Sequence, residues 1–196
     1  MKRVGAVMPN YNHADMIPQA IASLQAQTRP FDEIIVVDDG STDDSLAVIT
    51  QLAAADPRIR LIRHGRNRGA VAALNTDLGA TTVDFVHFAA ADDRFAPRLV
   101  EVLLALLEAH PAAAFACAEV ALIDRATGHP LCLRPAVRPA HRARGFSPAE
   151  SGRLLARMDN VMVSQAALFR RAPILELGGF SMSGSAPSQM GFSSAA

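Results

Sequence analysis

The stretch EIIVVDDGSTDDS, residues 33–45, decides the fold of this chain. Its β-branched first half predicts a short strand over 33–37, and the residues from Asp38 to Ser41 predict a turn at the end of that strand. Apolar residues at helical spacing then predict a helix over 46–54, with Ser41 or Thr42 as its N-cap. A strand, a polar turn and a helix thus follow one another here.

The same order recurs on both sides of this stretch. The other predicted strands are 4–8, 59–62 and 85–89, and the other predicted helices are 17–24, 69–80 and 97–108, the last with Pro97 at its first position. The apolar character of 85–89 is nearly continuous, as in a sheet that is covered on both faces. Alternating strands and helices predict an α/β fold with a mostly parallel sheet.

The alternation ends near residue 114. A strand over 115–123, a turn over 124–130 and a returning strand over 131–133 predict an antiparallel edge. The basic stretch from Arg134 to Arg144 predicts a loop, and Ser147 to Glu150 has the pattern of a capped helix start before Leu154 and Leu155.

The composition bounds the class of protein. Of the 196 residues, 19 are Lys or Arg and 19 are Asp or Glu, so the formal charge is zero, which argues against a disordered chain and against nucleic acid as a partner. We expect one domain over 1–180, followed by a low-complexity, disordered tail over 181–196 that carries no charge.

The cysteines and the N-terminal residues concern the cellular compartment. Cys117 and Cys132 lack the spacing of a redox pair or of a zinc site, which fits a reducing compartment. The apolar run from Val4 to Met8 is too short for the core of a signal peptide. The sequence therefore predicts a cytoplasmic protein.

Three loops are candidates for the functional site, because ligands of open parallel sheets bind at the carboxyl ends of the strands. These loops are residues 9–12, 38–41 and 90–93, and two of them carry a pair of neighbouring carboxylates. Neither of the latter has the glycine pattern of a dinucleotide-binding loop or of a P-loop, so a dinucleotide enzyme or an NTPase is disfavoured.

Several motifs, taken in order, resemble the nucleotide-sugar glycosyltransferases of family 2. They are VMPNYN at 7–12, QAQT at 25–28, EIIVVDDGSTD at 33–43, NRG at 67–69 with Asn75, ADD at 91–93, LFRR at 168–171 and LGGF at 177–180. The resemblance spans 4–180, and it implies the Rossmann-like GT-A fold, a three-layer sandwich around a mostly parallel sheet with an antiparallel edge.

The resemblance also implies a set of donor-binding residues. They are Pro9, Tyr11, Asn12, Asp38, Asp39, Asn67, Gly69 and Asp92. It implies that Tyr11 stacks on the base of a nucleotide diphosphate, usually UDP, and that Asp39 accepts a hydrogen bond from the uracil ring. The alternatives are a Tyr11 packed under a helix and an Asp38 that serves only as a helix cap or in an Asx turn.

The resemblance implies a divalent metal ion as cofactor. Asp92 and Asp93 resemble the end of the DxD signature that binds Mg²⁺ or Mn²⁺ together with the diphosphate, although Ala90 stands where the first Asp of that signature is expected. Mg²⁺ commonly takes one or two carboxylates plus phosphates and waters. The alternative is an acidic pair ahead of Pro97, at the N-terminal side of the predicted helix.

The implied reaction is an inverting displacement in which a carboxylate accepts the proton of the acceptor hydroxyl. No residue matches that general base, because nothing acidic follows Glu176, and the residues from Ser181 onward differ from the family pattern as in a shortened or altered C-terminus. The rival hypothesis is therefore a nucleotide-sugar-binding module without turnover.

The remaining candidates leave alternatives open. The acceptor is a glycan, a lipid-linked compound or a small molecule, and the basic loop from Arg134 to Arg144 contacts either an anionic acceptor or the inner face of the cell membrane, or is simply solvated. The six histidines, His64 among them, lack metalloprotease spacing and are interpreted as surface or packed residues.

Overall fold

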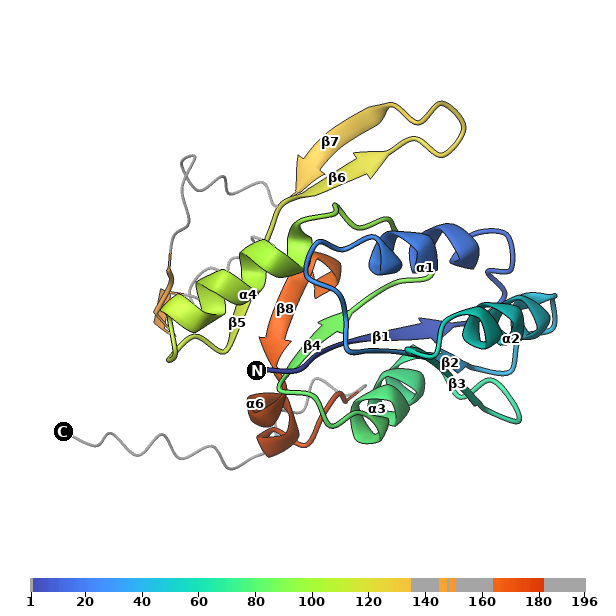
Figure 1. Cartoon of the computed structure of the whole chain (residues 1–196), viewed down its shortest axis with the longest axis horizontal. Coiled ribbons are helices and arrows are strands. Elements are labelled where there is room, and N and C mark those ends of the chain that lie inside the picture. Colours follow the sequence, from blue (N-terminus) through green and yellow to red (C-terminus); the bar gives the residue numbers. More distant parts are fainter. Residues whose placement is uncertain (1, 135–144, 148, 151–163, 182–196) are drawn as a thin grey trace.

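A six-stranded sheet with the strand order β3-β2-β1-β4-β8-β5 forms the middle of the domain (Figure 1). The computed structural model describes residues 2–134, 145–147, 149–150 and 164–181. The strands are β1 (Val4–Asn10), β2 (Glu33–Asp38), β3 (Ile59–Arg63), β4 (Phe85–Phe88), β5 (Phe115–Cys117) and β8 (Ala167–Arg170). Strands β1 to β4 run parallel, and β8 is antiparallel to β4 and β5. The predicted α/β class with a mostly parallel sheet is confirmed.

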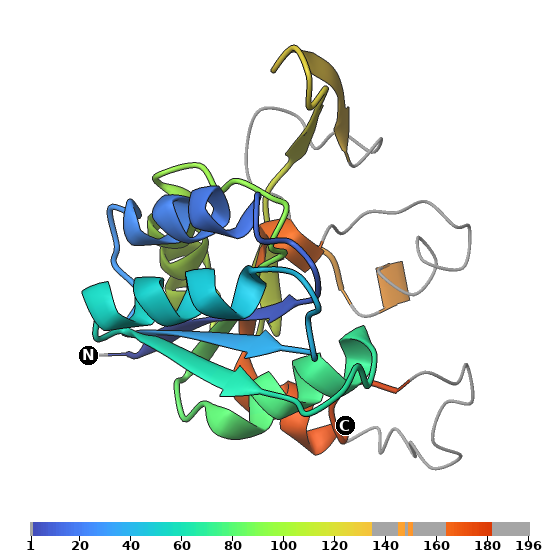
Figure 2. The same cartoon turned by 90° about the vertical axis from the view of Figure 1, so that its right-hand side faces the viewer.

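Helices cover both faces of this sheet and complete three layers (Figures 1 and 2). One face carries α1 (Ile17–Gln25), α2 (Ser45–Ala55) and α4 (Leu99–Ala109), and the other carries α3 (Ala70–Ala80) and the short α6 (Arg171–Glu176). A 3₁₀ turn, Ser164–Ala166, precedes β8.

Side chains of alternating positions on the strands enter two separate cores. Ala6 and Met8 of β1 pack with α1, α2 and α4, whereas Val7 packs with Ile35 of β2 and Leu78 of α3. Because both faces are buried, these strands are almost continuously apolar. This packing holds the carboxyl ends of β1, β2 and β4 in register at one edge of the sheet.

The predicted strand over 115–123 is wrong as a single element. Its first part, β5, pairs with β8, whereas its second part, β6 (Val120–Ile123), pairs with β7 (Pro130–Arg134) in a separate hairpin that projects from the layers (Figures 1 and 2). The apolar run contains no signal for this change of partner, since β8 follows about 50 residues later in the chain. The antiparallel edge of the main sheet is therefore formed with β8.

Two predicted helix starts are also wrong. Helix α4 begins at Leu99, because the carbonyl of Pro97 accepts hydrogen bonds from the backbone and hydroxyl of Thr28, at 2.8 and 3.3 Å. Helix α2 begins at Ser45, with Asp44 and neither Ser41 nor Thr42 at the N-cap position. At both starts a group of the predicted first turn bonds to another loop: the Pro97 carbonyl accepts from Thr28, and the Ser41 hydroxyl oxygen accepts from the amide of Asn12.

The capped turn at Ser147 is confirmed, because its amide donates to Glu150 Oε2 at 2.8 Å and its hydroxyl oxygen accepts from the Glu150 amide at 3.3 Å. Leu154 and Leu155, the loop residues 135–144 and the tail residues 182–196 lie outside the described residues. Within the described ranges, no helix has the length and the apolar character needed to span a bilayer.

Candidate functional site

The three candidate loops follow neighbouring parallel strands and lie at the same edge of the sheet. Asn10 is the register partner of Asp38, and the amide of Asp39 donates to the Asn10 carbonyl at 2.8 Å. On the other side of β1, Val7 is the register partner of Phe88, the last residue of β4 before the loop with Asp92. The topology thus brings the predicted site residues from distant parts of the sequence to one region.

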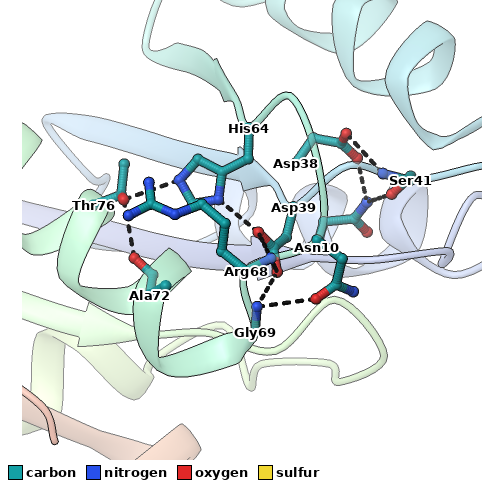
Figure 3. Close-up of polar contacts among 10 residues, drawn as sticks. Asn10, Asp38, Asp39, Ser41, His64, Arg68, Gly69, Ala72 and Thr76 are labelled. Atoms are coloured by element: carbon teal, nitrogen blue, oxygen red, sulfur yellow. Dashed lines mark hydrogen bonds and ion pairs between the residues drawn. The ribbon is translucent and has the colours of Figure 1, made fainter.

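The Asp39 carboxylate lies at the centre of this region and is only 3% exposed (Figure 3). Its oxygens accept hydrogen bonds from the amide of Arg68, at 3.0 and 3.1 Å, and from the amide of Gly69, at 2.8 Å. The imidazole of His64 lies 2.5 Å from Asp39 Oδ1. Asp39 therefore fixes the loop that leads into α3.

The charge on Asp39 is supported by these contacts. Burial raises the pKa of its carboxyl, but the hydrogen bonds from His64, Arg68 and Gly69 lower it, and the net pKa lies below the ordinary value for Asp. An ionised carboxylate can only accept hydrogen bonds, so His64 Nδ1 donates the one that they share. The contact of Asp39 with a nucleobase stays a prediction.

Asp38 is buried and orients the first two loops. One of its oxygens accepts from Asn10 Nδ2 and the other from the amide of Ser41, both at 3.2 Å (Figure 3). The hydroxyl oxygen of Ser41 in turn accepts from the amide of Asn12 at 3.0 Å. These bonds join the loop after β1 to the loop after β2, and the bond from the Ser41 amide, three residues after Asp38, closes the second loop.

Asn12 and Tyr11 occupy different environments. Asn12 has a φ of 57°, and its Oδ1 accepts from the Thr42 amide at 2.8 Å, so this side chain braces the loop after β2. Tyr11 as a residue is 41% exposed, which argues against the alternative of a core tyrosine and is compatible with a ring that stacks on a ligand. Pro9, at the end of β1, is half-buried.

The loops after β2 and β3 touch at Gly40. A Cβ atom at this position would lie 2.6 Å from the carbonyl carbon of Arg66 and 2.7 Å from the nitrogen of Asn67. Asn67 Oδ1 accepts from the amide of Gly69 at 2.9 Å, and Gly69, with a φ of 89°, precedes α3. The glycine after Asp39 therefore permits a backbone approach that a larger residue would prevent.

Asp92 and Asp93 follow β4, the former exposed and the latter half-buried. Burial and the neighbouring charge of Asp92 both raise the pKa of Asp93. Within the described residues, no group of three or more His, Cys, Asp or Glu side chains is placed to hold a metal ion. Two carboxylates that repel each other are nevertheless a donor set to which Mg²⁺ or Mn²⁺ adds phosphate and water ligands.

Two contacts of α3 were not predicted. Asn75 donates to the carbonyl of Phe180 at 2.8 Å and accepts from its amide at 2.9 Å, and a Cβ atom on Gly179 would lie 2.6 Å from Asn75 Oδ1. The other is the contact of Thr76 with His64 at 3.0 Å. The first joins residues 105 apart in the sequence, which the family motifs name without pairing them, and the second joins residues 12 apart on two different elements.

An open depression of about 500 Å³ lies beside these contacts. Its lining comes from the loop before α3 and from the first part of that helix: Arg68, Gly69, Val71, Ala72, Asn75 and Thr76. The depression therefore borders the loop that Asp39 holds.

Comparison with known proteins defines the class first. The fold is shared with the GT-A glycosyltransferases, among them a mannosyltransferase from Pyrobaculum calidifontis in complex with GDP-Man and Mn²⁺, with a TM-score of 0.66 and 24% identity over 92% of this chain and 48% of that one. TarS of S. aureus in complex with UDP-GlcNAc aligns with a TM-score of 0.67 and 20% identity over 89% of this chain and 47% of that one. At these identities the likeness shows the fold.

The family follows from the sequence itself. Residues 6–175 match the model of glycosyl transferase family 2, and the chain belongs to this family. An uncharacterized glycosyltransferase of Nostoc sp. is 42% identical over 105 residues, covering 51% of this chain and 32% of the relative. The succinoglycan biosynthesis protein ExoO of Rhizobium meliloti is 41% identical over 91 residues, or 46% of this chain and 26% of the relative. The chain thus matches about a third or less of these two curated relatives.

Proposed function

We propose that the chain transfers a sugar from a nucleotide-diphosphate donor, a UDP-sugar, to an acceptor hydroxyl with inversion at the anomeric carbon. One observation carries this proposal: an exposed aromatic ring, a buried carboxylate and two further carboxylates follow three neighbouring parallel strands at one edge of the sheet. Membership of family 2 and the nucleotide sugars bound by proteins of the same fold support it.

The donor-binding residues of this proposal are Pro9, Tyr11, Asn12, Asp38, Asp39, Asn67, Gly69 and Asp92. Tyr11 stacks on the base, since its ring is exposed at the end of β1. Asp39 acts at the base-binding side and holds the loop with Gly69 in place through its backbone hydrogen bonds. Asp38 and Asn12 keep the first two loops joined.

Asp92 and Asp93 are the residues that would hold Mg²⁺ or Mn²⁺. The raised pKa of Asp93 supports this assignment, because a cation between the two carboxylates would relieve their repulsion. A metal ion at this position supplies positive charge that stabilises the diphosphate leaving group. Ala90 contributes no ligand, so the site has fewer carboxylates than a full DxD signature.

In the proposed reaction the acceptor oxygen forms a bond to the anomeric carbon while the bond from that carbon to the diphosphate breaks. The proton of the acceptor hydroxyl passes to a general base, and the chain offers no residue that matches the base of the family. The loops described above act by binding and orienting the donor, which is where positioning lowers the barrier.

A nucleotide-sugar-binding module without turnover is the second candidate. It is favoured by the sequence from 181 to 196, which contains no Asp or Glu after the Gly-Gly-Phe motif where the family carries its base. Removing a general base costs about 10² to 10⁴ in rate. Under this alternative the donor still binds, but the sugar is not transferred.

Calorimetry with UDP, with and without Mn²⁺, tests donor binding, and release of UDP from a panel of UDP-sugars tests turnover. We expect Mn²⁺-dependent UDP binding that Asp92→Ala/Asp93→Ala abolishes without a change in circular dichroism. Glu108→Ala is the control, because Glu108 is an exposed acid far from the candidate site. Its neighbour Leu107 contacts Arg170, which pairs with the first residue of β4, whereas Asp92 and Asp93 follow the last. Equal UDP affinity in the double variant would remove the metal assignment, and binding without UDP release would favour the module.

Tyr11→Ala tests the stacking contact, with Tyr11→Phe as the matched control that keeps the ring. We expect Tyr11→Ala to weaken UDP binding by about 1 to 3 kcal/mol and Tyr11→Phe to change it little. Equal losses in the two variants would show that the hydroxyl, and not the ring, makes the contact.

The acceptor in this proposal is a glycan, a lipid-linked compound or a small molecule with a free hydroxyl. A cytoplasmic transferase would meet a lipid-linked acceptor at the inner face of the membrane, and the basic stretch that ends at Arg144 supplies charge for that contact. Flotation of the protein with anionic vesicles, compared with neutral vesicles, measures this association.

A further inference from the structure

His64 is a buried histidine, 6% exposed, whose two ring nitrogens contact two different elements (Figure 3). It follows β3 directly, and its amide donates to the carbonyl of Asp38 at 2.8 Å. On one side of the ring, Nδ1 lies 2.5 Å from Asp39 Oδ1, and on the other side Nε2 lies 3.0 Å from the hydroxyl oxygen of Thr76 in α3. The ring therefore connects the carboxyl end of β2 to the middle of α3.

Thr76 is fixed in turn, because its hydroxyl also lies within hydrogen-bond reach of the carbonyl of Ala72, at 2.9 Å, one helical turn earlier. The orientation of the His64 ring is thereby defined from both sides. The contact from the ring to Asp39 continues, through the carboxylate, to the amides of Arg68 and Gly69. A single chain of hydrogen bonds thus runs from α3 through His64 and Asp39 to the loop at the start of α3.

We propose that His64 is a positioning residue of the donor site, which holds the Asp39 carboxylate in the orientation that fixes residues 67–69 beside the proposed nucleotide. The effect of His64 on nucleotide binding rests on the proposed function. Its effect on the order of residues 67–69 does not, because those contacts exist in the protein without a ligand.

His64 is the side chain that sets the direction of the carboxylate. The two amide donors belong to the loop that Asp39 holds, so an orienting contact that does not depend on this loop has to come from another element. His64 approaches from the end of the neighbouring strand and is itself anchored by its backbone and by Thr76. Without the imidazole, the buried carboxylate loses the one side-chain donor that it has among the described residues and can rotate toward water.

The variants His64→Leu and His64→Asn separate shape from hydrogen bonding. Leu removes both ring contacts, whereas the amide nitrogen of Asn keeps a donor near the position of Nδ1. His110→Leu is the control, because His110 is an exposed histidine at the end of α4. Amide hydrogen exchange of residues 67–70 is measured without ligand, and UDP affinity is measured by calorimetry with Mn²⁺.

We expect His64→Leu to lose protection at 67–70, while the amides of β1 and β4 keep theirs, and to bind UDP about 10- to 100-fold more weakly. His64→Asn should retain protection and bind UDP more tightly than His64→Leu, and Thr76→Val should fall between wild type and His64→Leu. A merely structural histidine would instead lower protection throughout the sheet. It would also give no rescue by Asn.

The outcomes distinguish this inference from the proposed function. If the wild type binds UDP and His64→Leu binds it equally well, the inference is overturned and the proposed function stands. If the wild type binds no UDP but His64→Leu loses protection only at 67–70, the proposed function fails and the positioning of the loop stands. Should His64→Leu not fold, His64→Asn decides: retained protection at 67–70 supports the inference, and its loss overturns it.

Discussion

The close approach at Gly40 makes a specific prediction about stability. Gly40 has a φ of 75°, and a Cβ atom there would meet the backbone of Arg66 and Asn67 at 2.6 to 2.8 Å. Gly128, in the turn of the β6–β7 hairpin, has a similar φ of 72°, but no atom lies within 4 Å of its Cβ position. Gly40→Ala and Gly128→Ala therefore share the conformational cost and differ in the steric one.

The left-handed conformation costs an alanine about 1 to 2 kcal/mol. Forcing extra volume against a backbone that cannot rotate away adds about 1 to 3 kcal/mol. We expect Gly40→Ala to lower the free energy of unfolding by about 2 to 5 kcal/mol and Gly128→Ala by no more than about 2 kcal/mol.

Equilibrium urea unfolding followed by circular dichroism at 222 nm measures both losses. The difference between the two variants isolates the contact between the loops after β2 and β3. Should both variants lose the same free energy, these loops are not in contact at Gly40, and the rigid arrangement described around Asp39 is refuted.

Three further predictions concern stability away from that contact. Gly179→Ala should cost about 2 to 3 kcal/mol in the wild type but only about 1 to 2 kcal/mol in an Asn75→Ala background, and equal costs in urea unfolding would exclude the close contact between the two residues. Burial lowers the pKa of His87 to about 4, from 6.5 in the unfolded chain, so the unfolded state takes up its proton first as the pH falls. The free energy of unfolding should therefore lose about 3 kcal/mol between pH 6.5 and pH 4, a decline that His87→Leu should lack. Burial raises the pKa of Asp77, whose two oxygens have no hydrogen-bond partner among the described residues, so the wild type loses stability as the pH rises through that raised pKa. Asp77→Asn should be more stable than the wild type at pH 8 and equally stable at pH 3.5 in thermal unfolding, and an equal difference at both pH values would contradict this assignment.

The parallel core could be predicted from sequence because its signals are local. Val4 to Met8 and Glu33 to Val37 are β-branched or apolar runs that end at polar turns, and the structure extends these strands by only one or two residues. The order of polar loops along the chain then placed Asp38 and Asp92 near one edge, since parallel strands all end on the same side.

What the sequence could not predict depends on contacts between distant residues. The partner of β5 is a strand about 50 residues later, and nothing in the apolar run from Phe115 marks the residue at which the chain changes sheets. His64 is an isolated histidine among arginines in the sequence, and only the fold brings it to Asp39, 25 residues earlier. Ser41 has the pattern of a helix cap, but its hydroxyl accepts from Asn12 and Asn10.

The two halves of the candidate site differ in how firmly the protein holds them. Asp38, Asp39 and Gly40 are fixed by buried hydrogen bonds and by a close backbone contact, so the loops that would receive the base and ribose are already in place without a ligand. Asp92 and Asp93 make no side-chain hydrogen bond to the other described residues, and their neighbouring charges oppose each other. Preorganised contacts cost little entropy on binding, so we expect the nucleoside part of a donor to bind with little dependence on metal. The diphosphate is negatively charged, so we expect it to need a cation before it can lie beside two carboxylates. We therefore expect any metal dependence of donor binding to arise at the loop with Asp92 and Asp93, whereas the chain of hydrogen bonds through His64 belongs to the half that contains Asp39.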